Sequence, residues 1–147
     1  MYLVSSCLAG INCRYNGGNS EHKFIVELVK QGKAIAVCPE QLVGLPTPRP
    51  SCEIVIYKNG NKKVISKDGQ DFTKEFIEGA EKTLAIAKVI GIKKAILQSK
   101  SPSCGYGFIY DGTFSSKLIE GNGLTAELLI ENDIKVYTES NLDMLGV

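Results

Sequence analysis

The chain has 147 residues, of which 44% are hydrophobic and 22% charged, and its formal net charge is +1. These values are ordinary for a soluble globular protein, and the near-neutral charge argues against an extended surface for nucleic acids or membranes. A chain of this length suits one domain, so we expect residues 1–147 to fold as a single unit. No apolar run approaches the roughly 18 residues of a membrane span. Met1–Val4 lacks the basic start of an export signal, so we expect a cytoplasmic protein.

The first third of the chain predicts two short parallel strands joined through a helix. Residues 34–37 are an apolar run that ends at Cys38-Pro39-Glu40. A short apolar run of this kind is typical of a buried parallel strand. Pro46, Pro48 and Pro50 exclude a strand after it, because proline lacks an amide donor. The expected elements are a strand at 2–6, a loop at 7–18, a helix from a cap at Asn19 or Ser20 to about Gln31, a strand at 34–37 and a loop at 38–50.

The rest of the chain predicts a hairpin, two helices and two more strands. Asn59 and Gly60 are typical of a tight hairpin turn, and Gly91 ends the longest helix. The expected elements are hairpin strands at 53–57 and 63–66, a helix from Asp71 or Thr73 to Ile90, a strand at 94–98, loops at 99–107 and 106–123, a helix at 124–132, a strand at 134–138 and a helical turn at 141–145. This order predicts an α/β fold, a single-domain three-layer sandwich with a mostly parallel sheet and an inserted β-hairpin.

The five cysteines do not form a disulfide framework in this interpretation, because their number is odd and the expected compartment is reducing. No Cys-x-x-Cys pair occurs, so the local signatures of zinc ribbons and ferredoxins are missing. Three interpretations stay open: thiols that only pack in the core, a nucleophile, or metal ligands brought together by the fold.

Three of the cysteines follow the ends of predicted parallel strands. Cys7 follows the first strand, Cys38 the second, and Cys104 comes shortly after the third. The carboxyl ends of parallel strands lie on one edge of the sheet, so these thiols are expected to meet there. Three thiolates together need a cation, and soft sulfur ligands select zinc, Cu(I) or iron–sulfur clusters. Three protein ligands leave one position open, as a catalytic metal requires.

Polar residues near these strand ends are candidates for the same site, each with an ordinary structural alternative. Glu40 is a candidate general acid or base, or else a solvated loop carboxylate. Ser101 and Ser103 are candidates to hydrogen-bond a substrate or a cluster sulfur, or else part of a Ser-Pro turn. Arg14 and Arg49 are candidates to bind an anion or a negative cluster, or else form surface ion pairs.

The remaining candidates are assigned structural roles. Cys13 and Cys52 follow no strand end, so packing is the default for both. His22 is the single histidine and is expected to lie exposed at the start of a helix. A catalytic triad or a zinc site that needs several histidines is therefore not expected.

Three motifs in chain order together resemble the thiouracil desulfurase family. They are Ser5-Ser6-Cys7-Leu8-Ala9-Gly10 with Arg14-Tyr15, Cys38-Pro39-Glu40 with Gly44-Leu45-Pro46-Thr47-Pro48-Arg49-Pro50, and Ser101-Pro102-Ser103-Cys104-Gly105. Any one of them alone would be a weak signal, but jointly they are specific and span nearly the whole chain.

The resemblance implies a [4Fe–4S] cluster held by Cys7, Cys38 and Cys104, with its fourth iron free to bind the sulfur of a thiolated nucleobase. It further implies a non-redox conversion of 2-thiouracil to uracil and sulfide, assisted by Glu40 and Ser101, with Ser103 as the second choice for the serine. The expected partner is thus a small thiolated base, with no nucleic acid and no membrane. The oligomeric state stays open.

Two other hypotheses compete with an iron–sulfur desulfurase. One is a cluster-independent thiol enzyme that uses Cys38 or Cys104 as its nucleophile. The other is a non-catalytic module whose cysteines bind structural zinc or only pack. The first of these predicts one fast-reacting thiol and no need for iron, and the second predicts that a change at Glu40 affects only stability.

Overall fold

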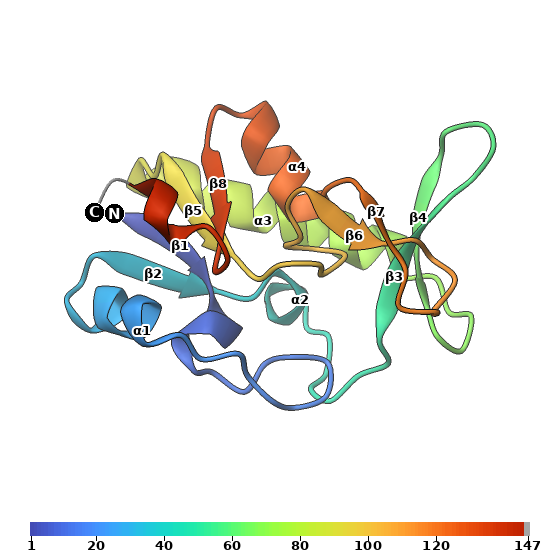
Figure 1. The fold of residues 1–147 in the computed structure, drawn as a ribbon, viewed down its shortest axis with the longest axis horizontal. Coiled ribbons are helices and arrows are strands. Elements are labelled where there is room, and N and C mark those ends of the chain that lie inside the picture. Colours follow the sequence, from blue (N-terminus) through green and yellow to red (C-terminus); the bar gives the residue numbers. More distant parts are fainter. Residues whose placement is uncertain (146–147) are drawn as a thin grey trace.

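The computed structural model describes residues 1–145 and contains a four-stranded, fully parallel sheet in the order β2-β1-β5-β8 (Figure 1). Its strands are β1 (Tyr2–Ser5), β2 (Ala34–Val37), β5 (Lys94–Leu97) and β8 (Lys135–Thr138). Ser5 pairs with Val37, and Leu97 pairs with Thr138, each the last residue of its strand. The carboxyl ends are therefore level along one edge, and the segments that follow them start side by side.

Helices cover both faces of this sheet, which confirms the predicted three-layer fold. Alternate residues of a strand point to opposite faces. Val4 and Ile96 accordingly pack in one core with Ile25 of α1 (Lys23–Lys30). Leu3, Ala95, Leu97 and Val136 pack in a second core with residues of α3 (Thr73–Ile90) and α4 (Leu124–Glu131). The short helix η2 (Leu142–Leu145) adds Leu145 to the first core.

Two antiparallel hairpins lie beyond the carboxyl edge of the sheet (Figure 1). The predicted hairpin is present as β3 (Cys52–Ile56) and β4 (Lys62–Ser66), with Gly60 at φ 84° in its turn. The second, β6 (Phe108–Tyr110) with β7 (Leu118–Glu120), falls in a segment expected to be a loop. Its strands have three residues each, too few for an alternating pattern to be recognised.

Two short helical turns directly after strands were also missed. They are η1 (Ser6–Ala9), after β1, and α2 (Pro39–Leu42), after β2. Pro39 occupies the first position of α2, where its missing amide hydrogen costs nothing. Both turns reverse the chain at the sheet edge and so set the direction of the side chains of Cys7 and Cys38.

The first long helix begins at Lys23, later than expected, because the residues before it bond to η1. The N–H groups of Ser20 and His22 donate to the carbonyls of Cys7 and Leu8, each at 2.9 Å. His22 is half-buried rather than exposed, and its Nδ1 atom is buried without a hydrogen-bond partner among residues 1–145. The expectation of an exposed histidine was wrong because this segment is held against the body of the protein. Within residues 1–145, no helix has both the length and the apolarity needed to cross a membrane.

Candidate active site

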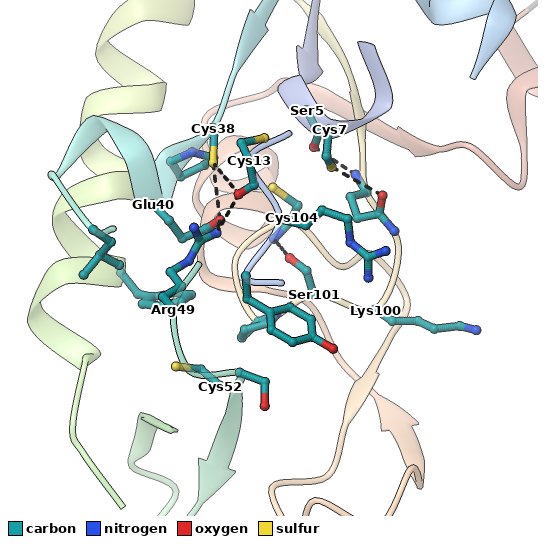
Figure 2. Close-up of a pocket in the computed structure, with 18 of the residues that line it drawn as sticks. Ser5, Cys7, Cys13, Cys38, Glu40, Arg49, Cys52, Lys100, Ser101 and Cys104 are labelled. Carbon is teal, nitrogen blue, oxygen red and sulfur yellow. Dashed lines mark hydrogen bonds and ion pairs between the residues drawn. The ribbon is translucent and has the colours of Figure 1, made fainter. Parts of the chain in front are cut away.

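A cavity of about 760 Å³ opens at the carboxyl edge of the sheet and is closed on its far side by residues of both hairpins (Figure 2). All of the candidate site residues named from the sequence line it except Ser103. Those that line it are Cys7, Cys38, Cys104, Glu40, Ser101, Arg14 and Arg49. Residues that lie 97 positions apart in the chain thus contribute to one space.

The three predicted thiols reach the cavity from three different segments. Cys7 lies in η1, Cys38 is the N-cap residue of α2, and Cys104 lies in the loop after β5. All are free thiols, exposed by only 8%, 8% and 5%. Cys13 joins them, 2% exposed, and its carbonyl accepts a hydrogen bond from Cys38 Sγ at 4.0 Å. Cys52 also lines the cavity but lies apart from this group (Figure 2).

These thiols do not form a site for one metal ion in the described part of the chain. No three His, Cys, Asp or Glu side chains within residues 1–145 lie close enough together to hold a single ion. A polynuclear iron–sulfur cluster instead needs cysteines that lie further apart, because each cysteine binds a different iron at a different corner of the cluster. The donor set is all sulfur, buried and spread over three loops, and it fits a cluster better than a mononuclear zinc site.

The environment of Cys13, Cys38 and Cys104 keeps these three thiols protonated when no metal is bound. A hydrogen bond with Cys13, burial and the nearby Glu40 carboxylate raise the pKa of Cys38 well above its usual range. Burial, followed by Glu40, raises the pKa of Cys104 in the same direction. The Cys38 hydrogen bond lowers the pKa of Cys13, but the contact with Cys7 and burial outweigh it and raise that pKa to about 11. A protonated thiol is a weak nucleophile, which disfavours the cluster-independent thiol enzyme.

Glu40 and Arg49 form a largely buried ion pair beside Cys38. Glu40 Oε2 accepts a hydrogen bond from Arg49 Nη2 at 3.0 Å and lies 3.5 Å from Cys38 Sγ. The two side chains are only 15% and 9% exposed. Glu40 Oε1 is buried and has no hydrogen-bond partner among residues 1–145. Oε2 is therefore fixed by Arg49, whereas Oε1 accepts no hydrogen bond from the described residues. Glu40 itself lines the cavity.

Arg49 also ties together the two loops that surround the thiols. It donates to the carbonyl of Cys13 at 3.0 Å, to the carbonyl of Pro46 at 3.3 Å and to Thr47 Oγ1 at 3.2 Å. Its N–H donors are thus used inside the protein, so its geometry suits the positioning of Glu40 better than the binding of a free anion.

The two serines of the third motif have different surroundings. Ser101 Oγ accepts hydrogen bonds from the N–H of Cys104 at 2.7 Å and of Ser103 at 3.2 Å, and Ser101 lines the cavity. Ser103 is 1% exposed and its hydroxyl is bonded to Thr125 Oγ1 at 2.8 Å, behind the cavity wall. Its position gives no support to the expected substrate contact.

The loop that carries Cys104 is anchored on the start of α4. The carbonyl of Ser103 accepts hydrogen bonds from the N–H groups of Thr125 at 2.8 Å and Ala126 at 3.2 Å. Gly123 is required at this contact, because a Cβ atom there would lie 2.4 Å from the Ser103 carbonyl oxygen. The backbone around Cys104 is therefore held from two sides, by Ser101 Oγ and by α4.

Sequence reasoning missed several residues that line the cavity. Ser5 and Gln98 stand at strand ends, so the rule that located the cysteines could have found them. Glu53 and Tyr110 come from the hairpins, and no sequence signal placed these next to the sheet edge.

Comparisons with known proteins agree with this site and with the three motifs. A family model described as 2-thiouracil desulfurase matches residues 2–141. The chain is 48% identical over 148 residues to the uncharacterized protein YbbK of Bacillus subtilis (strain 168), covering 97% of this chain and 98% of YbbK. Among solved structures it resembles TudS, a [4Fe-4S]-dependent thiouracil desulfidase, with a TM-score of 0.89 and 39% identity. That match covers 99% of this chain and 94% of TudS. The family predicted from the motifs is confirmed, and the chain belongs to the 2-thiouracil desulfurase family.

Proposed function

We propose that this protein is a [4Fe–4S]-dependent desulfidase that converts a thiolated pyrimidine base, 2-thiouracil as the reference substrate, to uracil and sulfide. Family membership and the likeness to TudS support the activity. The observation that carries the proposal for this chain is local. Three buried thiols from three loops share one cavity with a carboxylate whose second oxygen is unpaired.

Cys7, Cys38 and Cys104 would hold the cluster, since all three are free, buried thiols that line the cavity. Cys13 lies beside Cys38, whose thiol donates to the Cys13 carbonyl, but it follows no strand end, and we assign it as a neighbour rather than a ligand. When bound through three cysteines, a cluster of this kind supplies an iron with an open position, a Lewis acid suited to the sulfur of a thiocarbonyl group.

Glu40 would act as the general base toward water. Oε1 takes a proton from the water molecule whose oxygen bonds to the carbon that carries the sulfur. The carbon–sulfur bond then breaks, the sulfur leaves as sulfide, and the protons of the water end on the carboxylate and the sulfur. No electrons are gained or lost, so the reaction is a hydrolysis and needs no reductant.

Arg49 and Ser101 would support this step in different ways. Arg49 fixes Oε2, so that the unpaired oxygen of Glu40 keeps one orientation. Ser101 Oγ already accepts two backbone hydrogen bonds, which leaves its hydrogen free to donate to the base or to a negative charge that develops on it.

The test is turnover of 2-thiouracil by protein purified and reconstituted without oxygen, with uracil and sulfide measured as products. We expect equal amounts of both, only from protein that carries iron and sulfide. Activity in iron-free protein, abolished by alkylation of a single cysteine, would instead support the thiol enzyme. Cluster-loaded protein that releases no sulfide from any thiolated pyrimidine would contradict the proposal.

A further inference from the structure

Gln98 touches a predicted iron ligand and has no role in the proposed mechanism. It follows β5 directly, lines the cavity, and its Oε1 atom accepts a hydrogen bond from Cys7 Sγ at 3.4 Å. Its backbone N–H donates to Ser5 Oγ at 2.9 Å. Nε2 takes part in none of the hydrogen bonds between residues 1–145, so the carboxamide uses only its acceptor side.

This hydrogen bond suits a thiol but not an iron ligand. A cysteine binds iron through its thiolate sulfur, which has no hydrogen to donate. With Cys7 bound to iron, its sulfur and Gln98 Oε1 would be two acceptors facing each other. The contact becomes favourable again if the carboxamide rotates by half a turn, because Nε2 then donates to the sulfur.

Cys38 also meets acceptors in this structure, because its thiol donates to Glu40 Oε2 at 3.5 Å and to the Cys13 carbonyl at 4.0 Å. Neither of these groups carries a hydrogen-bond donor that could replace the acceptor, since one is a carboxylate and the other a backbone carbonyl. At Cys7, the hydrogen bond present is to the acceptor atom of Gln98. Cys7 is therefore the ligand whose neighbour can change from acceptor to donor by turning one side-chain amide.

We propose that Gln98 is a positioning residue for Cys7, whose side-chain amide reverses on cluster binding so that Nε2 donates a hydrogen bond to the Cys7 sulfur. The inference rests on the proposed function, because it needs a cluster ligated by Cys7. Donors to ligand sulfurs help to retain a metal centre and set its reduction potential.

The experiment separates donors from acceptors at this position. Gln98→Lys keeps only a donor, Gln98→Glu keeps only an acceptor and adds a negative charge, and Gln98→Leu keeps neither. Challenged with an iron chelator, the Lys variant should retain its cluster like the wild type. The Leu variant should lose its cluster about 10-fold faster, and the Glu variant up to about 100-fold faster.

Gln70→Leu is the matched control, because Gln70 lines the same cavity but bonds through its backbone to Ser66. Unfolding temperatures of the iron-free variants separate a folding defect from a cluster defect. A second readout is the reduction potential of the cluster, which should become more negative in the Glu and Leu variants but not in the Lys variant, whose donor and positive charge both favour the reduced cluster.

Two results would overturn the inference, and they can be told apart. Equal rates of cluster loss and equal potentials in the Lys and Glu variants would refute the role of Gln98 while leaving the proposed function intact. A wild-type protein that takes up no iron and sulfide under reducing conditions would refute the proposed function, and this inference with it.

Discussion

The cavity has two sides that are built differently. On the sheet side, Cys7, Cys38, Glu40 and Cys104 come shortly after strands of a fully parallel sheet, whose ends are level and whose two faces are each covered by a hydrophobic core. On the hairpin side, β3–β4 and β6–β7 are two-stranded, and Tyr57, Phe108 and Leu118 are exposed. The sheet side carries Cys7, Cys38, Cys104 and Glu40, which need fixed positions under the proposed function, and the hairpin side closes the cavity.

The hairpin side has a small core of its own, in which Ile54, Val64 and Ile109 pack with Phe76 of α3, and a buried carboxylate also links its two hairpins. Glu53 on β3 is 9% exposed, and its Oε1 accepts hydrogen bonds from the N–H of Gly112 at 3.0 Å and of Phe114 at 3.1 Å. Both amides belong to the turn between β6 and β7. Changes on the sheet side should therefore affect the chemistry, whereas changes on the hairpin side should affect stability and access.

The largest effect is expected from the sheet-side thiols. Alanine at Cys7, Cys38 or Cys104 should abolish both cluster binding and desulfuration, because two cysteines do not hold a cluster that already has an open position. Cys52→Ala, on the hairpin side of the same cavity, should leave both unchanged. Absorbance of the reconstituted proteins and their iron content measure this, and loss of the cluster in the Cys52 variant would contradict the division of roles.

Glu40→Gln should lower turnover about 10²- to 10⁴-fold, because the amide cannot accept the proton of the attacking water. Iron and sulfide content should stay at the wild-type level, since Glu40 is not proposed as a ligand. Initial rates normalised to cluster content are the measurement. A rate within a few-fold of the wild type would show that another group is the base.

Arg49→Met should destabilise the protein by about 3 kcal/mol, because it leaves the Glu40 carboxylate largely buried without its cation. In a protein that already carries Glu40→Gln, Arg49→Met should destabilise less, because no buried negative charge is left without its partner. Urea unfolding of the two single variants and the double variant gives the coupling. Strictly additive losses would mean that the pair does not stabilise the site.

On the hairpin side, Glu53→Ala should cost about 1–3 kcal/mol, because two backbone donors lose their acceptor. Glu53→Gln keeps a carbonyl oxygen in place and should cost less. Hydrogen exchange at the amides of Gly112 and Phe114 should quicken in the Ala variant, with cluster content unchanged. Unchanged exchange rates at both amides would show that Glu53 does not hold the two hairpins together.

The smallest effect is expected at the start of α3. Thr73 hydrogen bonds to Asp71 lower the pKa of this fully exposed carboxyl below its usual value. The resulting stabilisation is present above the ordinary aspartate pKa of about 3.9 and is lost as the pH falls through the lower folded pKa. Asp71→Ala should therefore lower the unfolding temperature slightly at pH 7 and not at pH 2. Equal shifts at both pH values would contradict this.

The difference between the two sides also explains how far the sequence could predict the site. Cys7, Cys38 and Cys104 could be located because the hydrophobic pattern predicts parallel strands. The carboxyl ends of such strands lie on one edge of the sheet. Cys13 was missed as a neighbour because an irregular loop brings it there. Arg49 was identified as a candidate, but its pairing with Glu40 depends on a proline-rich loop with no repeating pattern.

The two hairpins differ in how far their local sequence predicts them. Asn59-Gly60 predicts its own hairpin, because the turn alone determines the local pairing. The β6–β7 hairpin has an Asp111-Gly112 pair too, but residues 111–117 separate its strands, so this pair does not form a two-residue turn. Its position depends on Glu53, some 60 residues earlier in the chain, and on the core that Ile109 shares with β3 and β4. Non-local hydrogen bonds of this kind leave no trace in local sequence.

Iron and acid-labile sulfide, counted per chain after anaerobic reconstitution of the wild type and of Cys104→Ala side by side, test the central claim most directly. We predict about four of each per wild-type chain and loss of the cluster in the variant, whose iron-free form should still fold. A wild type that binds neither iron nor sulfide, or a variant that keeps its cluster, would contradict the account of three sheet-edge thiols holding a desulfidase cluster.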